Sequence, residues 1–325
     1  MNQSQPITVG IFGIGPIGAE IARLLLKKKW ARLTAAVDID PSKTGKDLGE
    51  VLGLGERLGV PVTQALETAP QVVCHSTSSR LQQVQDQLAS ILRNGSHVVS
   101  TCEELAFPLD DDIRASLDRV ATEAKVALLG TGVNPGFVMD KLPLTLSAVC
   151  QEVTSIEVFR YVDASRRREP LQRKVGAGMT EDEFRSAVGA GKIKHMGLRE
   201  SLMMVAHGLG AKLAEVSDER IEPMMATADI TTDYLTVRSG QVAGVHQTIF
   251  GKGTIDISLE LKMYVGAQQP ADRVIIRGIP DVTMEIAGGV HGDRATAAMV
   301  VNCIPRLLTA RPGVLTMDDI PVSFH

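Results

Sequence analysis

Aromatic residues are scarce in this chain of 325 residues, in which Phe, Trp and Tyr together make up 3%. We therefore expect an aliphatic core and few rings that can stack on a ligand. Cysteine is also rare, and no C-x-x-C pair occurs among Cys74, Cys102, Cys150 and Cys303. This spacing argues against a zinc site or a disulfide framework and favours free thiols in a reducing cytoplasm.

Long apolar runs and an excess of positive charge are missing too. No run approaches the roughly 18 apolar residues of a membrane-spanning helix. The first residues lack the basic region and apolar stretch of a secretory signal, so we expect a cytoplasmic protein without a membrane partner. The net charge of −4 argues against a nucleic-acid partner. The histidines lack metal-ligand spacing, and we expect no metal.

A glycine-rich turn near the start of the chain is the first motif with chemical meaning. The apolar stretch ITVGIF is followed by Gly13-x-Gly15-x-x-Gly18 and then by apolar residues at helical spacing. Such glycines allow a tight turn, close approach of a pyrophosphate and close helix–strand packing. The sequence therefore predicts a dinucleotide cradle made by Gly13, Gly15, Pro16, Ile17 and Gly18.

An acidic residue follows the second predicted strand, LTAAVD. Asp38 lies 20 residues after Gly18, at the distance where a carboxylate binds the adenosine ribose. A carboxylate there favours NAD, since it repels the 2′-phosphate of NADP. Ser42, Lys43 and Lys46 follow closely and are able to bind that phosphate. The cofactor is thus expected to be NAD or NADP, with Asp38 and Lys43 as contacts.

Strands and helices alternate through the first half of the chain, which predicts a parallel, Rossmann-type sheet. Ligands bind such sheets beyond the carboxyl ends of the strands. Three predicted strand ends carry polar residues or glycines: His75-Ser76-Thr77, Cys102-Glu103-Glu104 and Gly130–Gly136, which includes Asn134.

Each of these ends has a functional and a structural interpretation. His75, with Ser76 and Thr77, is expected at the nicotinamide, although a structural histidine explains it equally well. Cys102 is most simply a small buried residue beside the cofactor. Asn134 is expected to bind the carboxamide or the substrate amine, whereas a tight turn alone would explain only its glycine and proline neighbours.

The pattern changes after Asp140. Strand-like segments separated by turns predict a second, α+β domain with a mainly antiparallel sheet that binds substrate and pairs two chains. We expect an α/β protein with residues 1–138 as the dinucleotide domain and 139–291 as the substrate and dimerisation domain. A helix within 292–325 is expected to pack back on the first domain, and the protein is expected to be a homodimer.

Several long segments resemble one family. They are GIFGIGPIG, VDIDPSKTGKDLGEVLG, STCEEL, GTGVNPGFVMD, VDASRRREPLQRKVGAGMTEDEF, KHMGLRESLMM and GDRATAAMVVNCIPRLLTARPGVLTMDDIP. Together they look like 2,4-diaminopentanoate dehydrogenase and the native amine dehydrogenases, over nearly the whole chain. The resemblance implies NAD(P)-dependent oxidation of an amine or diamino acid to a ketone and ammonia, and reductive amination in reverse.

Two more distant relatives differ at the residues that matter. The wider group includes dihydrodipicolinate reductase, but this chain lacks the His-His…Lys hallmark of that enzyme. Homoserine dehydrogenase carries a lysine at the strand end that would fall on Glu103. A cationic proton donor is thus replaced by a carboxylate. An imine reductase and a catalytically silent dinucleotide-binding protein are the alternative interpretations.

Glu103 and Glu104 are the candidate catalytic groups, because deamination needs a base and gains from negative charge near the iminium. Glu103 directly follows the strand and is preferred over Glu104. The segment 163–174 carries five basic and two acidic residues. Arg167 within it is a candidate clamp for a substrate carboxylate, or part of a solvated or dimer-contact loop. Family segments also contribute Phe137 and His195 as candidate substrate residues, and Asn302 as a cofactor contact or a core amide.

Overall fold

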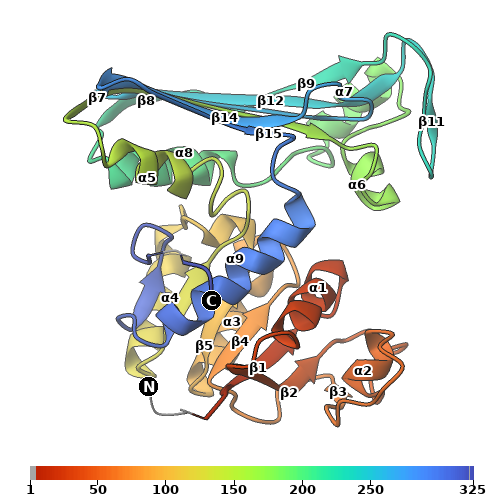
Figure 1. The fold of residues 1–325 in the computed structure, drawn as a ribbon, viewed down its shortest axis with the longest axis vertical. Helices are drawn as coiled ribbons and strands as arrows, with labels where there is room; N and C mark the ends of the chain where they lie inside the picture. The colour runs from red at the N-terminus through yellow and green to blue at the C-terminus, as the bar shows by residue number, and fades with distance from the viewer. Residues whose placement is uncertain (1–4, 322) are drawn as a thin grey trace. The chain divides into compact units, whose positions relative to one another are not determined.

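The computed structural model describes residues 5–321 and 323–325. The chain divides into two compact units (Figure 1). One consists of the residues up to Phe137 together with His291–His325, and the other of Val138–Val290. The chain therefore leaves the first unit once and returns to it for its last segment.

The first unit contains a seven-stranded sheet in which every neighbouring pair is parallel. Its strands are β1 (Ile7–Phe12), β2 (Ala31–Val37), β3 (Val62–Thr63), β4 (Val72–His75), β5 (His97–Ser100), β6 (Ala127–Gly130) and β16 (Gly313–Leu315). The order is β16-β6-β5-β4-β1-β2-β3, so the direction of winding reverses between β1 and β4. That reversal places the ligand crevice of a doubly wound sheet beyond the ends of β1 and β4. The predicted Rossmann-type sheet is confirmed.

Helices cover this sheet because its strands are apolar on both faces. All four residues of both β4 and β6 are buried, as parallel sheets require. The helical segments are α1 (Pro16–Leu25), α2 (Leu48–Val51), α3 (Leu81–Arg93), the short 3₁₀ helix η1 (Glu103–Leu105), α4 (Asp111–Glu123) and α9 (Gly292–Leu307). α1 packs beside α9, and α3 packs beside α4.

The second unit is built on a mixed but mainly antiparallel sheet, as predicted. Its main order is β15-β14-β7-β13-β12-β8, with β9 also paired to β12, and only β7 and β13 run parallel among these pairs of described strands. The strands are β7 (Glu152–Asp163), β8 (Leu213–Val216), β9 (Arg220–Met225), β12 (Val242–Gly253), β13 (Asp256–Tyr264), β14 (Ala271–Ile279) and β15 (Val282–Ala287), with β10 (Ile230–Thr231) and β11 (Thr236–Val237) as a separate pair.

Helices lie on one face of this second sheet. They are α5 (Lys141–Ser147), α6 (Glu169–Lys174), α7 (Glu181–Gly189) and α8 (Leu198–Gly208). α5 and α8 contact its strands from one side (Figure 1). Burial alternates along the strands: Ile156 and Val158 of β7 are fully buried, whereas Phe159 and Tyr161 are only partly buried. The sheet thus has a packed face and a face that carries partly exposed side chains.

Local sequence explains where the helices begin. The Asp110 carboxylate accepts the backbone N–H of Ile113 at 3.0 Å and caps α4. Thr180 and Glu183 form a reciprocal capping box at the start of α7.

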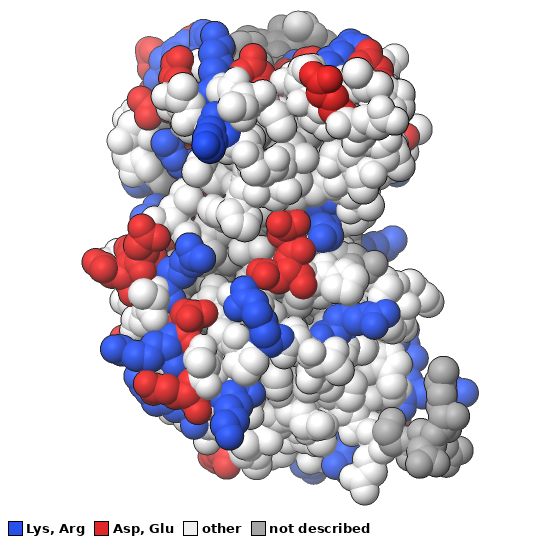
Figure 2. Space-filling model, turned by 90° about the vertical axis from the view of Figure 1, so that its left-hand side faces the viewer, with Lys and Arg blue, Asp and Glu red and all other residues white. Residues whose placement is uncertain are grey.

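Figure 2 shows basic and acidic side chains interspersed on the face that it draws. No helix of the described residues is long and apolar enough to cross a bilayer.

Candidate active site

The glycine turn after β1 has the geometry of a phosphate cradle. Gly13 has a φ of +90°, and a Cβ there would lie 2.5 Å from the Ser76 carbonyl oxygen. A Cβ on Gly18 would lie 1.9 Å from the Gly13 carbonyl oxygen. A Cβ on Gly15, by contrast, would meet nothing within 4 Å. Two glycines are therefore needed to close the turn, and the third leaves open space beside the backbone.

The helix that follows the turn suits an anion. α1 begins with Gly15 as its N-cap and Pro16 in its first turn, and that turn contains no acidic residue. The first N–H groups of a helix lack intrahelical partners and lie at the positive end of its dipole. Dinucleotide pyrophosphates bind at this kind of helix terminus. The geometry of the turn and helix thus fits the pyrophosphate of NAD(P).

Asp38 lies beside this cradle, at the end of β2. Its carboxylate accepts the backbone N–H of Ile14 at 2.8 Å and that of Asp40 at 2.9 Å, and it pairs with the Lys43 ammonium at 3.0 Å. Burial alone would raise the pKa of Asp38, but these hydrogen bonds and the Lys43 charge together lower it. The ribose end of the site therefore holds an ionised carboxylate next to a lysine.

Ser76 and Thr77, predicted as cofactor contacts, have partners within the protein. The Ser76 hydroxyl donates to the Gly13 carbonyl at 2.9 Å and links the loop after β4 to the glycine turn. The Thr77 hydroxyl donates to Gln87 Oε1 at 2.9 Å. Both side chains thus hold the walls of the cradle in place.

His75 does not reach the site surface. Its ring is fully buried, and both ring nitrogens have partners: Nδ1 lies 2.9 Å from the Ser100 hydroxyl, and Nε2 lies 3.0 Å from Gln87 Oε1. Burial lowers the pKa of His75 to about 4. This geometry supports the structural interpretation of His75, and its contact with the nicotinamide stays a prediction.

Cys102 is likewise enclosed. Its side chain is buried, and its thiol donates to the Ser79 carbonyl at 3.3 Å. Burial raises the pKa of the Cys102 thiol to about 12. A thiol with that pKa is neither a nucleophile nor a base at neutral pH, which agrees with the interpretation as a small buried residue. Its role as a cofactor contact stays a prediction.

The two glutamates differ in their surroundings. Both lie in η1, directly after β5, at the carboxyl edge of the sheet. Glu104 Oε2 accepts the backbone N–H of Leu81, the first residue of α3, at 2.6 Å. The Glu104 backbone N–H also donates to the Ser79 carbonyl at 3.2 Å. Glu104 is therefore occupied as a cap of α3, while the partly buried Glu103 begins η1 beside it.

The loop 131–136 contains a residue that the sequence did not single out. The Thr131 side chain is buried, and its hydroxyl has no hydrogen-bond partner among the described residues. Asn134 is also buried, and the Val133 N–H donates to the Thr296 hydroxyl of α9 at 3.2 Å. A buried hydroxyl without a partner is costly unless a ligand satisfies it. Thr131 lies between Gly130 and Gly132, directly after β6, and this position is the sequence feature that could have singled it out.

Asn302 and Phe137 occupy different surroundings. Asn302 Oδ1 accepts the backbone N–H of His325 at 3.3 Å. This bond ties α9 to the end of the chain and supports the core-amide interpretation of Asn302, and its contact with the cofactor stays a prediction. Phe137 is partly buried and ends the first segment of the first unit.

The second unit gathers positive charge around His195. Lys174, Arg160 and Arg167 act on its imidazole, and together with burial, the larger cause, they lower the pKa of His195 to about 3. Arg160 is held by Asp272 through two contacts of 2.9 and 3.0 Å. Arg167 is buried, and its carbonyl accepts from Gln172 Nε2 at 2.8 Å. The unit therefore holds its cationic side chains close to a neutral histidine.

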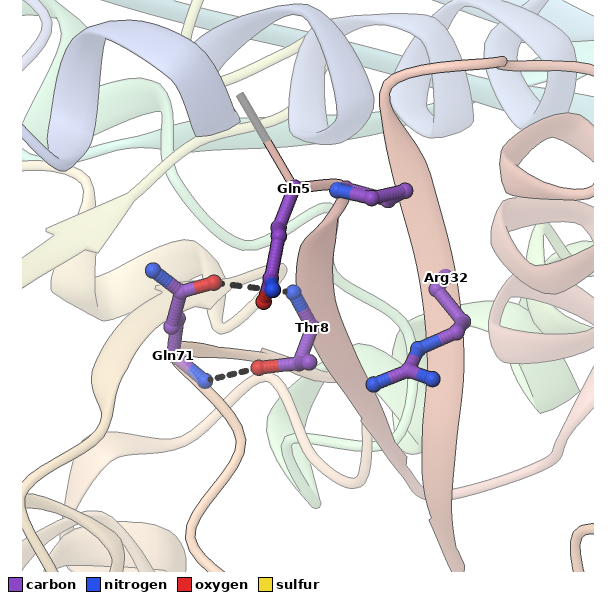
Figure 3. Close-up of a pocket in the computed structure, with 5 residues that line it drawn as sticks. Gln5, Thr8, Arg32 and Gln71 are labelled. Carbon is purple, nitrogen blue, oxygen red and sulfur yellow. Dashed lines mark hydrogen bonds between the residues drawn. The ribbon is translucent and has the colours of Figure 1, made fainter. Parts of the chain in front are cut away.

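A separate hollow lies at the opposite edge of the first sheet. It has a volume of about 640 Å³ and is lined by Gln5, Pro6, Thr8, Arg32 and Gln71. Figure 3 shows how Thr8 and Gln71 bond to each other across it, at 3.0 and 2.9 Å. Because these residues lie at the amino ends of the strands, we assign no part of the cofactor site to this hollow.

Among the described residues, no group of three His, Cys, Asp or Glu is placed to hold a metal.

Comparison with known proteins covers both units. Residues 137–324 match the 2,4-diaminopentanoate dehydrogenase C-terminal domain, and residues 7–105 match the N-terminus of dihydrodipicolinate reductase. The 2,4-diaminopentanoate dehydrogenase of Acetoanaerobium sticklandii is 33% identical over 98% of this chain and 94% of its own length. The amine dehydrogenase of Streptomyces virginiae is 25% identical over 97% and 96%.

Solved structures agree on the fold. The amine dehydrogenase from Mycobacterium smegmatis superimposes with a TM-score of 0.88 at 22% identity, covering 100% of this chain and 99% of that one. A dihydrodipicolinate reductase from Paenisporosarcina superimposes with a TM-score of 0.55 at 14% identity. Curated reductases of that kind match only 68 residues of this chain, which is 21% of its length. Similarity to the reductases in sequence is thus confined to the dinucleotide end.

Proposed function

Because the chain belongs to the 2,4-diaminopentanoate dehydrogenase family, we propose that it oxidises an amino group of a diamino acid like 2,4-diaminopentanoate to a ketone and releases ammonia. The chain is an oxidoreductase that uses NAD(P). When bound, NAD(P)⁺ would supply the acceptor for the hydride that leaves the carbon bearing the amino group. The same site run in reverse would aminate a ketone or an aldehyde.

The balance of this reaction defines what the protein must supply. A substrate ammonium, NAD(P)⁺ and water give a ketone, ammonium, NAD(P)H and one proton. A base must therefore take one proton from the ammonium before the hydride leaves, and it must assist the water that attacks the iminium. A fixed negative charge also stabilises the iminium cation. One carboxylate at the nicotinamide end of the crevice can serve both needs.

Glu103 is our candidate for that carboxylate. The observation that carries the assignment is the hydrogen bond from Leu81 N–H to Glu104, because it gives the Glu104 carboxylate a structural task as a helix cap. Glu103 lies beside the strand end, on the edge of the sheet where Asp38 and the glycine turn also lie. A carboxylate at this position can act as a general base in proton transfer.

The positive charge around His195 supports a substrate that carries a carboxylate. Burial, together with the nearby Lys174, Arg160 and Arg167, lowers the pKa of His195 to about 3, which supports a cluster of cationic side chains in the second unit. A carboxylate would be attracted there, and a guanidinium can bind it through two parallel hydrogen bonds. A simple amine has no negatively charged group that these cationic side chains would attract. We therefore favour the diamino acid over plain amines as the substrate.

We also propose that two copies of the chain pair through the partly exposed face of the second sheet. Phe159 and Tyr161 contact each other edge to face at 6.3 Å, and Lys262 lies 4.7 Å from the Tyr161 ring centre. Glu260 binds Lys262 at 2.7 Å and His246 at 3.0 Å on the same face. Aromatic side chains are enriched at protein interfaces. Light scattering of the native chain and of Tyr161→Glu tests this homodimer.

A substrate panel tests the proposed reaction. The chain would be assayed with NAD⁺ and NADP⁺, each with 2,4-diaminopentanoate or a plain amine of similar length, and in reverse with ammonia and the matching ketones. Formation of reduced nicotinamide with the diamino acid at a far lower KM than with the plain amine is the expected result. Equal KM values would contradict the carboxylate argument, and no turnover with any amine would favour a silent dinucleotide-binding protein.

We expect the protein in the cytoplasm, where its free thiols stay reduced.

A further inference from the structure

A chain of buried hydrogen bonds runs beneath the turn that carries Glu103. The His75 ring is fully enclosed between Ser100 on β5 and Gln87 on α3, at 2.9 and 3.0 Å. The Ser100 hydroxyl lies 3.1 Å from the backbone N–H of Cys102, the residue before Glu103. Helix α3, strand β4 and strand β5 are thereby linked to the base of η1.

The direction of each bond follows from which atoms carry protons. Gln87 Oε1 has no proton and already accepts from Thr77, so His75 Nε2–H must donate to it. The neutral ring then offers Nδ1 as an acceptor, and the Ser100 hydroxyl proton fills it. The oxygen of that hydroxyl keeps its lone pairs for Cys102 N–H. Thr77 Oγ1 also lies 3.0 Å from Nε2, so this nitrogen faces two oxygens while Nδ1 faces Ser100.

The same turn is held from its other side by a different set of bonds. The Cys102 thiol and the Glu104 N–H both donate to the Ser79 carbonyl, at 3.3 and 3.2 Å, and Glu104 caps Leu81. These contacts fix the end of the turn that lies toward α3. The Ser100 hydroxyl fixes the end that leaves the sheet, so Glu103 follows directly after the residue that it anchors.

We propose that His75 and Ser100 are positioning residues that orient the Glu103 carboxylate for proton transfer. The inference depends on the proposed role of Glu103 as the base. His75 acts through Ser100 and the Cys102 backbone, and it touches neither substrate nor cofactor. A change of about 1 Å in the place of a catalytic group can lower turnover about 100-fold.

Burial supports this role over a wide pH range. Because burial lowers the pKa of His75 to about 4, the ring is neutral at physiological pH and Nδ1 stays an acceptor. Phe12 packs against the ring at a centroid distance of 5.5 Å and helps to fix its orientation. The acceptor for Ser100 is thus held in one position while the enzyme turns over.

Ser100→Ala is the direct test, and Ser96→Ala is its matched control. Both serines are fully buried, Ser100 at the end of β5 and Ser96 just before its start. The Ser96 hydroxyl has no hydrogen-bond partner among the described residues. We expect Ser100→Ala to lower kcat with the preferred diamine by up to about 100-fold, with the Kd of the reduced cofactor unchanged. Ser96→Ala should leave both constants unchanged.

A double-variant cycle separates positioning from general support of the structure. If Ser100 acts through Glu103, then Ser100→Ala should lower kcat in the native chain but cause no further loss in the Glu103→Gln background. An equal loss in both backgrounds, or a native kcat in Ser100→Ala, would overturn the proposal. Failure of the proposed base is a separate result, because it would appear as full turnover in Glu103→Gln alone.

His75 itself gives a second, independent comparison. The side-chain oxygen of His75→Asn can accept from the Ser100 hydroxyl, whereas His75→Leu is of similar size and cannot. At a temperature where both variants are folded by circular dichroism, we expect His75→Asn to keep the higher kcat. Equal kcat values in the two variants would count against the acceptor role of His75.

Discussion

The backbone N–H of Leu81 donates to the Glu104 carboxylate at 2.6 Å, across 23 residues of sequence. One glutamate of the pair Glu103-Glu104 thereby completes the first turn of α3, where unpaired N–H groups need an acceptor. Glu103, its neighbour in η1, is our candidate for chemistry at the strand end. The two carboxylates are adjacent in sequence and differ in the task that the fold gives them.

Replacing Glu104 should therefore affect stability more than catalysis. Glu104→Ala removes the acceptor of the Leu81 N–H, and loss of a helix cap costs about 1 kcal/mol. Urea unfolding followed by circular dichroism measures this loss. Glu104→Gln keeps an oxygen acceptor and should recover part of it. A fall in kcat as large as that of Glu103→Gln would contradict the division of roles.

Replacing Glu103 should have the opposite effect. Glu103→Gln keeps the size of the side chain and removes its charge and basicity, so kcat should fall by about 100-fold or more. Binding of the reduced cofactor, followed by its fluorescence, should stay as in the native chain. Turnover at the native rate would show that the base lies elsewhere.

Asp38 and Lys43 should together set the cofactor preference. Asp38 accepts two backbone N–H groups and the Lys43 ammonium, and its lowered pKa keeps it ionised through the neutral range. Asp38→Ala removes the acceptor for the ribose hydroxyls and leaves Lys43 to attract a 2′-phosphate. The ratio of kcat/KM for NADP⁺ over that for NAD⁺ should rise by about tenfold or more. Adding Lys43→Met to Asp38→Ala should reverse that gain. If the gain persists, Lys43 is not the group that attracts the 2′-phosphate.

His75 should make the stability of the protein depend on pH. Burial holds the folded pKa of His75 near 4, below its ordinary value of 6.5, so the unfolded chain binds the proton first. The contribution of His75 is complete above pH 6.5 and is lost as the pH falls toward 4, by about 1.4 kcal/mol per unit. Urea unfolding at several pH values should show a shallower slope for His75→Asn than for the native chain. Parallel slopes would argue against a buried neutral ring.

Arg167 should distinguish substrates with a carboxylate from those without one. Arg167→Leu should raise the KM for 2,4-diaminopentanoate by about tenfold or more and leave the KM for a plain amine unchanged. Arg167→Lys keeps the charge but lacks the planar guanidinium, so its KM for 2,4-diaminopentanoate should lie between those of the native chain and Arg167→Leu. Arg166, which is exposed, offers the control Arg166→Leu. An equal rise for both substrates would point to a structural role.

Local patterns along the chain account for much of the fold. The spacing of Gly13, Gly15 and Gly18 predicts the turn, and the structure shows that a Cβ at Gly13 or Gly18 would clash with backbone whereas Gly15 leaves open space. The capping box of Thr180 and Glu183 predicts the start of α7. Alternation of strands and helices predicts the parallel sheet, and the run of strands after Asp140 predicts the mainly antiparallel one.

Tertiary contacts decide the parts that local patterns leave open. His75 is a plausible cofactor ligand in sequence, but Ser100 and Gln87, 25 and 12 residues away, take both of its nitrogens. Thr131 lies between two glycines in the sequence, but that its buried hydroxyl lacks a partner among the described residues becomes visible only when its surroundings are known. Asn302 fits two roles equally well in sequence, and its bond to His325 favours the core amide.

The sequence by itself determined the dinucleotide fold and the pair of glutamates that follows the strand HVVS, because spacing along the chain dictates both. Only the tertiary structure showed that Glu104 caps the start of α3. Leu81 and Glu104 lie far apart in sequence, and folding brings a helix start to a strand end where one N–H requires one acceptor. That requirement is met by Glu104, and the chemistry we propose therefore falls to Glu103.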